Sequence, residues 1–406
     1  MSSKRSDISR RSFLSASITG LVSAGLAGMT PGLVLAQDDK KKKSDGKIIY
    51  RKLGRTGMKV SIIGMGAAAA GSPAIVQAAC EKGINHFDTA ANYQFGRNEQ
   101  MVGDVISKLG LRDKIVIGTK ILIQPQREAL SPEALKQKAA TLVEGSMKRL
   151  RTDYIDIVYV HDVSTVEAVR QPGLAEAMKE LKKSGKVKAI GLSTHANMAV
   201  ILNEAKTSGD WDVVLTSFNF TMVDDAEMMA AIKAAAESGI GIVAMKTLAG
   251  GSRWPNPESR QNYSTSTVAK AILRWVVNNE FIHSAIPGFS NFDQFNDDAE
   301  IASNLEYTDE EKKLLNDNNI KLSLGFCRQC KTCLASCPND TDIPALMRTY
   351  MYAAQYGDFH LARTTLDQLP QSRNLKTCAD CIECVARCAN TVDIAARIAE
   401  LKLMYA

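Results

Sequence analysis

Four ionisable side chains lie at or just after the ends of successive apolar runs in the first half of the chain. They are Asp88, Tyr93, Lys120 and His161. In a closed barrel of parallel strands, the carboxyl ends of all strands meet at one mouth, where the chemistry of that fold collects. We therefore expect these four side chains to share one site.

This set of residue types suits the interconversion of a carbonyl and an alcohol, which needs a hydride and a proton. A tyrosine can donate the proton, but its ordinary pKa of about 10 makes the phenolate costly near neutrality. A nearby cation lowers such a pKa. We therefore expect Tyr93 to act as general acid and base, Lys120 to tune it, Asp88 to hold Lys120, and His161 to orient the substrate oxygen.

Each of these residues also has a plainer interpretation. An aspartate at a strand end often caps the next loop, and a tyrosine at a barrel rim can simply be packed there. A lysine can be solvated, and a lone histidine is more often a packed polar residue than a catalyst. The hypothesis depends on the joint placement of the four residues.

The elements that would position these residues alternate between strands and helices. The expected strands are 60–64, 84–87, 115–120, 155–161, 189–193, 213–215, 240–245 and 284–286. The expected helices are 74–82, 98–109, 132–150, 174–184, 198–206, 226–238, 268–277 and 292–301. Eight such units predict an α/β fold, a (β/α)8 TIM barrel, over residues 48–320. A hairpin formed by residues 48–53 and 58–61 is expected to close its floor.

With these residues in this order, the stretch from about 48 to 305 resembles the aldo-keto reductases. The resemblance implies a nicotinamide cofactor, NAD(P)(H), and a small carbonyl or alcohol substrate. It gives Asp88, Tyr93, Lys120 and His161 the roles assigned above. It also implies a set of nucleotide contacts, namely Ser193, Lys246, Gly250, Gly288, Ser290 and Gln294.

The cofactor pocket departs from the family pattern in several places. Thr194, Leu215 and Met245 stand where the family usually has Asn, Gln and a stacking tyrosine. The usual Lys and Arg for a 2′-phosphate are absent, and Asp297 and Asp298 follow instead. Two aspartates would repel that phosphate. NAD(H) in place of NADP(H), or no exchangeable nicotinamide, are both open at this point.

The C-terminal region of about 85 residues contains a second candidate site. Eight of the nine cysteines occur there, in two runs spaced C-x₂-C-x₂-C-x₃-C. The first run is Cys327, Cys330, Cys333 and Cys337, and the second is Cys378, Cys381, Cys384 and Cys388. This is the spacing of two-cluster ferredoxins, where the fourth thiolate of each run binds the other run's cluster.

We therefore expect two [4Fe–4S] clusters in residues 321–406. Cys327, Cys330, Cys333 and Cys388 would hold one cluster. Cys337, Cys378, Cys381 and Cys384 would hold the other. Helical patterning between the runs resembles the all-helical ferredoxin type. Zinc or disulfides are the alternatives, but zinc pairs are usually separated by longer loops, and such close spacing strains a disulfide. The ninth cysteine, Cys80, is expected to be a small buried side chain.

The N-terminus has the pattern of an export signal. Arg10 and Arg11 precede a moderately apolar run that ends at Ala36. This predicts a twin-arginine signal peptide at 1–36, followed by a polar linker at 37–47. A retained membrane anchor is the alternative. Clusters are assembled in the cytoplasm, so a folded route of export to the periplasm or another extracytoplasmic space agrees with the cysteine pattern.

Two functions follow from these features. The first is an exported oxidoreductase in which the barrel interconverts a carbonyl and an alcohol and the clusters relay electrons to a redox protein partner. The second is an electron-transfer or redox-sensing module whose barrel is a docking scaffold. The formal charge of +6 is inflated by Lys40–Lys43 and indicates no nucleic-acid partner. Membrane contact is expected only through the signal segment, if it is uncleaved.

Overall fold

The computed structural model describes residues 46–123, 130–250, 263–318, 320 and 325–405. The predicted signal segment and nearly all of the predicted linker lie outside these residues. Among the helices of the described chain, none combines the length and apolar character needed to span a bilayer.

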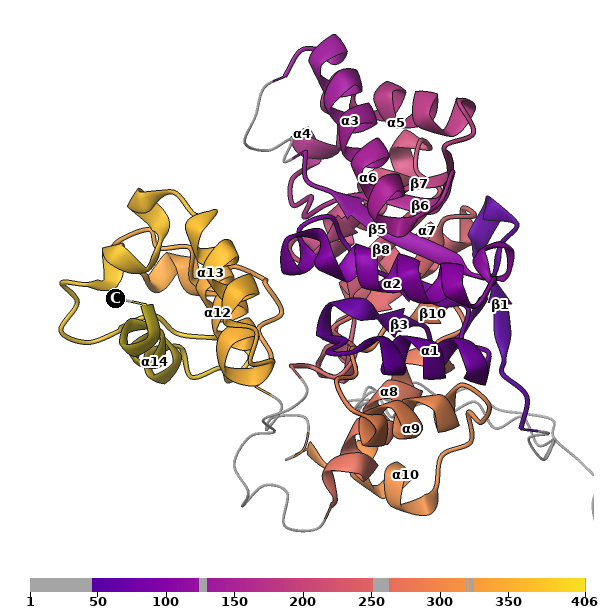
Figure 1. Cartoon of the computed structure of the whole chain (residues 1–406). Coiled ribbons are helices and arrows are strands. Elements are labelled where there is room, and N and C mark those ends of the chain that lie inside the picture. Colours follow the sequence, from indigo (N-terminus) through magenta and orange to yellow (C-terminus); the bar gives the residue numbers. More distant parts are fainter. Residues whose placement is uncertain (1–45, 124–129, 251–262, 319, 321–324, 406) are drawn as a thin grey trace, which may run out of the picture. The chain divides into compact units, whose positions relative to one another are not determined.

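Eight parallel strands form one sheet, with the helices packed around it (Figure 1). The strands are β3 (Met65–Gly66), β4 (His86–Asp88), β5 (Val116–Ile121), β6 (Ile155–Val160), β7 (Val187–Thr194), β8 (Val213–Ser217), β9 (Gly241–Met245) and β10 (Ser284–Ala285). They pair in sequence order. A parallel bridge between Ile63 and Ala285 joins the two edges, so the sheet closes into the predicted barrel.

The helices follow the predicted bounds closely. They are α1 (Pro73–Lys82), α2 (Arg97–Lys108), α3 (Pro132–Leu150), α4 (Val166–Val169), α5 (Leu174–Lys183), α6 (Met198–Ser208), α7 (Ala226–Glu237), α8 (Thr265–Asn278), α9 (Phe292–Ile301) and α10 (Asp309–Leu315). Ser131 caps α3 by accepting from the Ala134 amide at 3.2 Å. Thr308 and Glu311 form a capping box at the start of α10. Such caps each contribute about 1 kcal/mol.

The predicted hairpin is present, but the predicted first barrel strand was wrong. Strands β1 (Tyr50–Lys52) and β2 (Lys59–Ser61) pair antiparallel, and β2 takes up the start of the run assigned to the barrel. The first barrel strand is instead β3, which pairs with β4. An apolar run predicts that a strand is buried, but it does not predict which neighbouring strand it pairs with. Leu53, in the hairpin loop, is fully buried against Gly241, so the hairpin does close the floor.

The barrel interior is filled around one aromatic ring. Tyr159, in β6, is fully buried. A Cβ atom at Gly191 would lie 2.7 Å from the Tyr159 ring, and one at Gly118 would lie 3.1 Å from it. Glycines on the two flanking strands therefore make room for the tyrosine. Its hydroxyl has no hydrogen-bond partner among the described residues, and Asp88 lies near enough to raise its pKa further after burial.

The C-terminal region is helical and has a core of its own. It contains α12 (Ile343–Tyr350), a π-helical turn η8 (Met351–Gln355), α13 (Phe359–Asp367) and α14 (Ile394–Tyr405). Leu346 and Leu401 are fully buried in its core. Asp342 caps α12 and Asp393 lies before α14, and each accepts from the amide three residues on. Each cysteine run is thus followed by a helix with the same cap.

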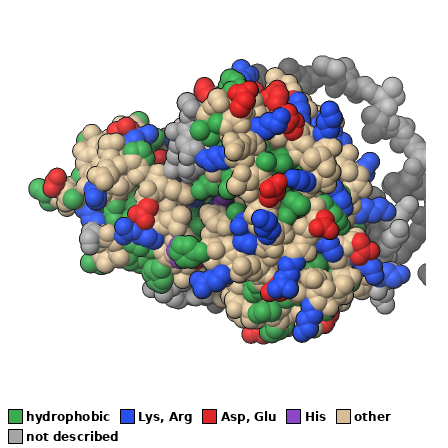
Figure 2. Space-filling view, turned by 45° about the horizontal axis from the view of Figure 1, so that its top comes forward, with side chains coloured by type: hydrophobic (Ala, Val, Ile, Leu, Met, Phe, Trp, Pro, Cys, Tyr) green, Lys and Arg blue, Asp and Glu red, His purple; other side chains and the backbone are tan. Residues whose placement is uncertain are grey.

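Charged side chains on the face drawn in Figure 2 are of mixed sign. Lys and Arg residues alternate with Asp and Glu residues there, and no single stripe of one charge is visible. Surface charges also pair with one another, for example Lys186 with Glu144 at 2.6 Å. Such exposed pairs contribute little to stability.

Candidate active site

A buried ion pair forms the base of the candidate site. Asp88 ends β4 and Lys120 lies in β5, the neighbouring strand. The Lys120 ammonium donates to a carboxylate oxygen of Asp88 and, at 2.8 Å, to the Thr89 carbonyl. Their side chains are 1% and 4% exposed, so this is a desolvated pair. Burial raises the pKa of Asp88, and the Lys120 charge opposes that rise.

Tyr93 lies above this pair, at the start of the turn η3 (Tyr93–Gly96). The Lys120 ammonium is 4.9 Å from the centre of the Tyr93 ring. Burial raises the pKa of Tyr93 well above its ordinary value, and Asp88, Tyr352 and Asp358 raise it further. The net shift of this pKa is opposite in direction to the expected one, because desolvation, its largest cause, favours the neutral phenol. The phenol stays protonated and able to donate.

His161 follows β6 directly and completes the predicted group of four. Its ring lies 6.3 Å from that of Tyr93, in an edge-on arrangement. Burial and, after it, the charge of Lys120 lower the pKa of His161 to about 3. Its Nδ1 atom has no partner among the described residues. A neutral imidazole in this position can donate one N–H to a substrate oxygen without adding a charge.

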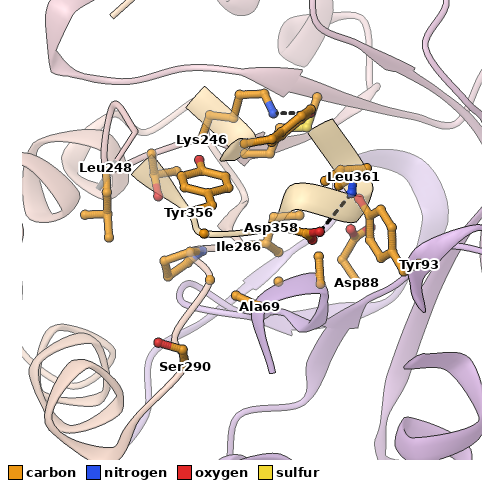
Figure 3. Close-up of a pocket in the computed structure, with 18 of the residues that line it drawn as sticks. Ala69, Asp88, Tyr93, Lys246, Leu248, Ile286, Ser290, Tyr356, Asp358 and Leu361 are labelled. Carbon is orange, nitrogen blue, oxygen red and sulfur yellow. Dashed lines mark hydrogen bonds between the residues drawn. The ribbon is translucent and has the colours of Figure 1, made fainter. Parts of the chain in front are cut away.

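A cavity of about 700 Å³ opens in front of these side chains, within the usual size of a ligand pocket. Asp88, Tyr93 and His161 line it, while Lys120 lies behind them. Figure 3 shows Tyr93 and Asp88 on one side and Lys246 and Tyr356 on another. The structure therefore brings all four predicted catalytic residues to one site.

The predicted nucleotide contacts are only partly brought together. Lys246, Gly288, Ser290 and Gln294 line the cavity. The Ser290 amide donates to the side-chain oxygen of Gln294 at 2.8 Å.

Ser193 and Gly250 do not line the cavity. Ser193 is fully buried, and its hydroxyl accepts from the Asp162 amide at 3.2 Å. Gly250 has a φ of +95°, and a Cβ atom there would lie 2.3 Å from a side-chain oxygen of Gln355. The glycine is needed for the contact between the β9 loop and the C-terminal region.

Several features of the pocket fit a nicotinamide dinucleotide. A Cβ atom at Gly288 would lie 3.1 Å from that of Ala69, so the glycine lets the backbone pack closely at the pocket wall. The Thr247 hydroxyl and the Nδ1 atom of His195, which both line the pocket, are buried without hydrogen-bond partners among the described residues. Asp297 and Asp298, in α9, also line the pocket. Leu215 faces the apolar barrel interior, and Met245 lines the pocket.

Sequence reasoning missed the residues that the C-terminal region adds to this cavity. They include Arg348, Tyr352, Tyr356, Asp358, His360 and Gln368. Arg348 pairs with Asp162 through two bonds of 3.2 and 3.3 Å. The Tyr352 hydroxyl accepts from Lys246 at 2.9 Å. The ring of His360 lies 3.9 Å from that of Phe95. One signal was available: Arg348 is the single charged residue in the apolar helix α12.

Thiols from the two cysteine runs lie near one another in the C-terminal region. Burial raises the pKa of the Cys327 thiol to about 12, and nearby Cys333 and Cys388 raise it further. Burial also raises the pKa of Cys378, and its neighbours among the thiols are Cys381 and Cys337. Cys388 therefore lies near Cys327 of the first run, and Cys337 lies near Cys378 of the second run as well as near Cys333 of its own run.

The donors around these sulfurs fit cluster ligands. The Asn339 amide group lies 3.1 Å from the Cys381 sulfur, and the Asn390 backbone amide lies 3.3 Å from that of Cys388. All nine cysteines fall within the described residues, and none forms a disulfide. In that same part of the chain no three acidic, Cys or His side chains converge on a single ion. A cubane cluster binds four thiolates through four separate iron atoms, so its ligands need not converge as zinc ligands do.

Cys80, in α1, is apart from both runs. It is 8% exposed, and burial raises its pKa to about 12. It is the buried small side chain that the sequence predicted.

Comparison with curated proteins identifies relatives of the barrel. The chain is 36% identical over 155 residues to the aldo-keto reductase YhdN of Bacillus subtilis (strain 168), covering 36% of this chain and 46% of that protein. It is 26% identical over 293 residues to L-galactose dehydrogenase of Arabidopsis thaliana, covering 64% of this chain and 90% of that protein. The chain therefore spans less than half of the first relative and nearly all of the second.

Solved structures show the same fold. An aldo-keto reductase from Bacillus halodurans in its holo form has a TM-score of 0.53 and 24% identity, with 68% of this chain and 95% of that one covered. A thermostable aldo-keto reductase solved with the inhibitor epalrestat has a TM-score of 0.53 and 21% identity, with 66% and 99% covered. At these identities the likeness concerns the fold alone.

Matches to families cover both regions of the described chain. Residues 63–265, half of the chain, match the Aldo/keto reductase family. Residues 326–392 match the 4Fe–4S dicluster domain. The protein is therefore an enzyme of the aldo/keto reductase family, a (β/α)8 barrel that carries a C-terminal iron–sulfur domain.

Proposed function

We propose that this enzyme interconverts a small carbonyl compound and an alcohol using a nicotinamide nucleotide, and that two [4Fe–4S] clusters relay electrons between it and a redox protein. The observation that carries the proposal is the shared cavity. Asp88, Tyr93 and His161 border it from the barrel, while Arg348 and Tyr352 border it from the iron–sulfur domain. One pocket is thus built from both redox parts of the chain.

A bound nicotinamide would supply or accept the hydride; the proton chemistry belongs to the protein. Tyr93 holds a proton on its phenol oxygen because burial keeps its pKa high. It donates that proton to the substrate oxygen as negative charge develops there. The neutral His161 ring orients the same oxygen through an N–H. Lys120 provides a fixed positive charge beneath the phenol, which offsets the phenolate left behind.

Lys246 is the residue we assign to the pyrophosphate, together with the backbone at Gly288. The ammonium of Lys246 has no carboxylate within ion-pair distance among the described residues, so its charge is available to an anion. We expect NADH to bind more tightly than NADPH, because Asp297 lines the pocket and its carboxylate would repel a 2′-phosphate. A tenfold preference corresponds to about 1.4 kcal/mol.

The iron–sulfur domain would hold one cluster on Cys327, Cys330, Cys333 and Cys388. It would hold the other on Cys337, Cys378, Cys381 and Cys384. A cluster of this kind takes up one electron, so two clusters together match the electron pair of one hydride. This capacity supports a relay to a redox protein partner.

Export in the folded state agrees with this arrangement. We propose that residues 1–36 are a twin-arginine signal peptide, that residues 37–47 are a polar linker, and that the enzyme works in the periplasm or another extracytoplasmic space. The support is Arg10–Arg11 before an apolar run, together with the need to load clusters before export. The named activities of relatives, L-galactose dehydrogenase and pyridoxal 4-dehydrogenase, support a small carbonyl or alcohol substrate.

The test is a titration of cluster-loaded protein with NADH and NADPH, followed by nicotinamide fluorescence. We expect binding of NADH that weakens at least tenfold in Lys246→Ala. The matched control is Lys233→Ala, because Lys233 lies on the surface of α7, with Glu237 at 3.9 Å and the centre of the Phe281 ring at 5.8 Å, and does not line the pocket. Absence of nucleotide binding, with clusters that still take up electrons, would favour the docking-scaffold alternative.

A further inference from the structure

A second, much smaller cavity lies beside the first and shares a wall with it. Its volume is about 10 Å³, room for roughly one water molecule. His195, Lys246 and Arg348 line both cavities. These three side chains therefore separate the catalytic pocket from whatever lies on the far side of the small cavity.

A cluster ligand lies on that far side. The small cavity is also lined by Cys327, Gln329 and Arg397. The Gln329 side chain donates to the Cys327 sulfur at 3.3 Å. Asn390 contacts the Cys388 sulfur through its backbone amide at 3.3 Å and the Cys330 sulfur through its side-chain amide at 3.7 Å, so Cys388 lies beside the first run. None of Cys337, Cys378, Cys381 and Cys384 lines either cavity.

Two of the three wall residues, Lys246 and Arg348, are cationic side chains that line both cavities. Arg348 is held by Asp162, and its side chain is 10% exposed. Lys246 has the Tyr352 hydroxyl as a neutral partner, and its ammonium lies 4.6 Å from the Tyr352 ring centre. His195 is neutral, because burial and, after it, the charge of Lys246 lower its pKa well below the ordinary value. Lys246 is thus the wall cation whose charge is least compensated.

We propose that the cluster site formed by Cys327, Cys330, Cys333 and Cys388 is the inner one, and that His195, Lys246 and Arg348 form a wall through which its charge and the charge of a ligand in the pocket are coupled. The site of Cys337, Cys378, Cys381 and Cys384 is then the outer one. Ile382, between two of those ligands, is fully exposed. The biological meaning of this inference rests on the proposed function, whereas the redox measurement that tests it does not require reductase activity.

The sign of the coupling follows from electrostatics. Reduction adds one negative charge to a cluster, so a nearby cation favours the reduced state. Removing the cation lowers the reduction potential of the cluster next to it. An anion bound against the wall lowers the reduction potential of the inner cluster. By linkage, reduction of that cluster weakens the binding of the anion by the same free energy.

The test is a redox titration of the full, cluster-loaded protein followed by electron paramagnetic resonance at pH 6. Burial lowers the pKa of Lys246 to about 7, so its ammonium is charged at that pH. Cys330→Ser identifies the signal of the inner site and Cys381→Ser that of the outer site. Lys246→Met is the test variant, and Lys246→Arg, which keeps the charge, is its control.

Two more variants calibrate the assignment. Arg397→Gln removes a cation beside the inner site, since Arg397 lines the small cavity with Cys327. Lys402→Gln removes one beside the outer site, since the Lys402 charge favours the Cys378 thiolate. Iron and sulfide counts on each variant show that the clusters are loaded.

We expect Lys246→Met and Arg397→Gln to lower the potential of the inner signal and leave the outer signal in place. An effect of about tenfold in the reduction equilibrium, or about 59 mV for one electron, is the size expected of a unit charge in a partly buried site. A shift of the outer signal in Lys246→Met, or no shift of either, would overturn the inference. Carbonyl turnover plays no part in this readout, so a failed reductase assay leaves its outcome intact.

Discussion

Removing the Lys120 ammonium is the perturbation whose size the structure defines best. Lys120 is 1% exposed and donates to the Asp88 carboxylate and to the Thr89 carbonyl. The second carboxylate oxygen of Asp88 has no hydrogen-bond partner among the described residues. In Lys120→Met the carboxylate loses its counter-charge in a place where burial already raises its pKa.

Breaking a buried ion pair by removing one partner costs about 3–5 kcal/mol. That is a large share of the total stability of a typical domain, about 5–15 kcal/mol. The double variant Asp88→Asn/Lys120→Met removes both charges of this pair. Its main remaining loss is the donor to the Thr89 carbonyl, about 1–2 kcal/mol. We therefore expect the double variant to be more stable than Lys120→Met alone.

Anaerobic urea unfolding of the full chain, followed by circular dichroism, measures these differences. The same preparations, assayed for carbonyl reduction, should show that neither the single nor the double variant is active. Two results would show that Asp88 and Lys120 are not a desolvated ion pair. One is a loss of less than about 1 kcal/mol in the free energy of unfolding of Lys120→Met. The other is a loss in the double variant as large as the sum of the losses in Lys120→Met and Asp88→Asn.

Three further outcomes are expected. Stability should fall as the pH drops from 6.5 toward 4, because burial and the charge of Lys120 lower the pKa of His86 to about 4, and unfolding then takes up a proton. The slope is about 1.4 kcal/mol per pH unit for that residue; it should be smaller in His86→Asn, and an unchanged slope would contradict this. Gly103→Ala should destabilise the protein by about 1–3 kcal/mol, because its Cβ would lie 2.5 Å from the Leu150 backbone. In the control Gly71→Ala the added Cβ meets no atom within 4 Å, so its effect on stability in thermal unfolding should be near zero. Arg348→Gln should weaken the contact between the barrel and the iron–sulfur domain, because the Arg348–Asp162 pair joins α12 to the loop after β6. Limited proteolysis should then cleave the iron–sulfur domain faster than in the unchanged protein. Equal cleavage rates would show that this pair does not hold the two regions together.

Much of the barrel could be predicted because its signals are local. Continuous apolar runs marked the strands, and the helix starts at Ser131 and Thr308 carry capping side chains of the type that sequence favours there. The first barrel strand was misplaced because Val60 and Met65 lie in one apolar stretch that the fold divides between two sheets. Burial alone does not distinguish an antiparallel partner from a parallel one.

The site was predictable only where the chemistry lies at strand ends. Asp88 and Lys120 are adjacent because β4 and β5 pair directly. The contribution of the iron–sulfur domain was not predictable, because Arg348 and Tyr352 reach the pocket through contacts distant in sequence. The pKa of Tyr93 was predicted in the wrong direction for a related reason. Desolvation depends on everything that covers the ring, including Tyr352 and Asp358 from that domain.

Transfer of deuterium tests the central claim most directly. Cluster-loaded protein is incubated with NADH deuterated at the transferable position and with a panel of small aldehydes, and the alcohols formed are analysed by mass spectrometry. We predict deuterium on the former carbonyl carbon with the unchanged protein, and none with Tyr93→Phe although NADH still binds. Oxidation of NADH by the clusters with no deuterium in any alcohol would contradict the account.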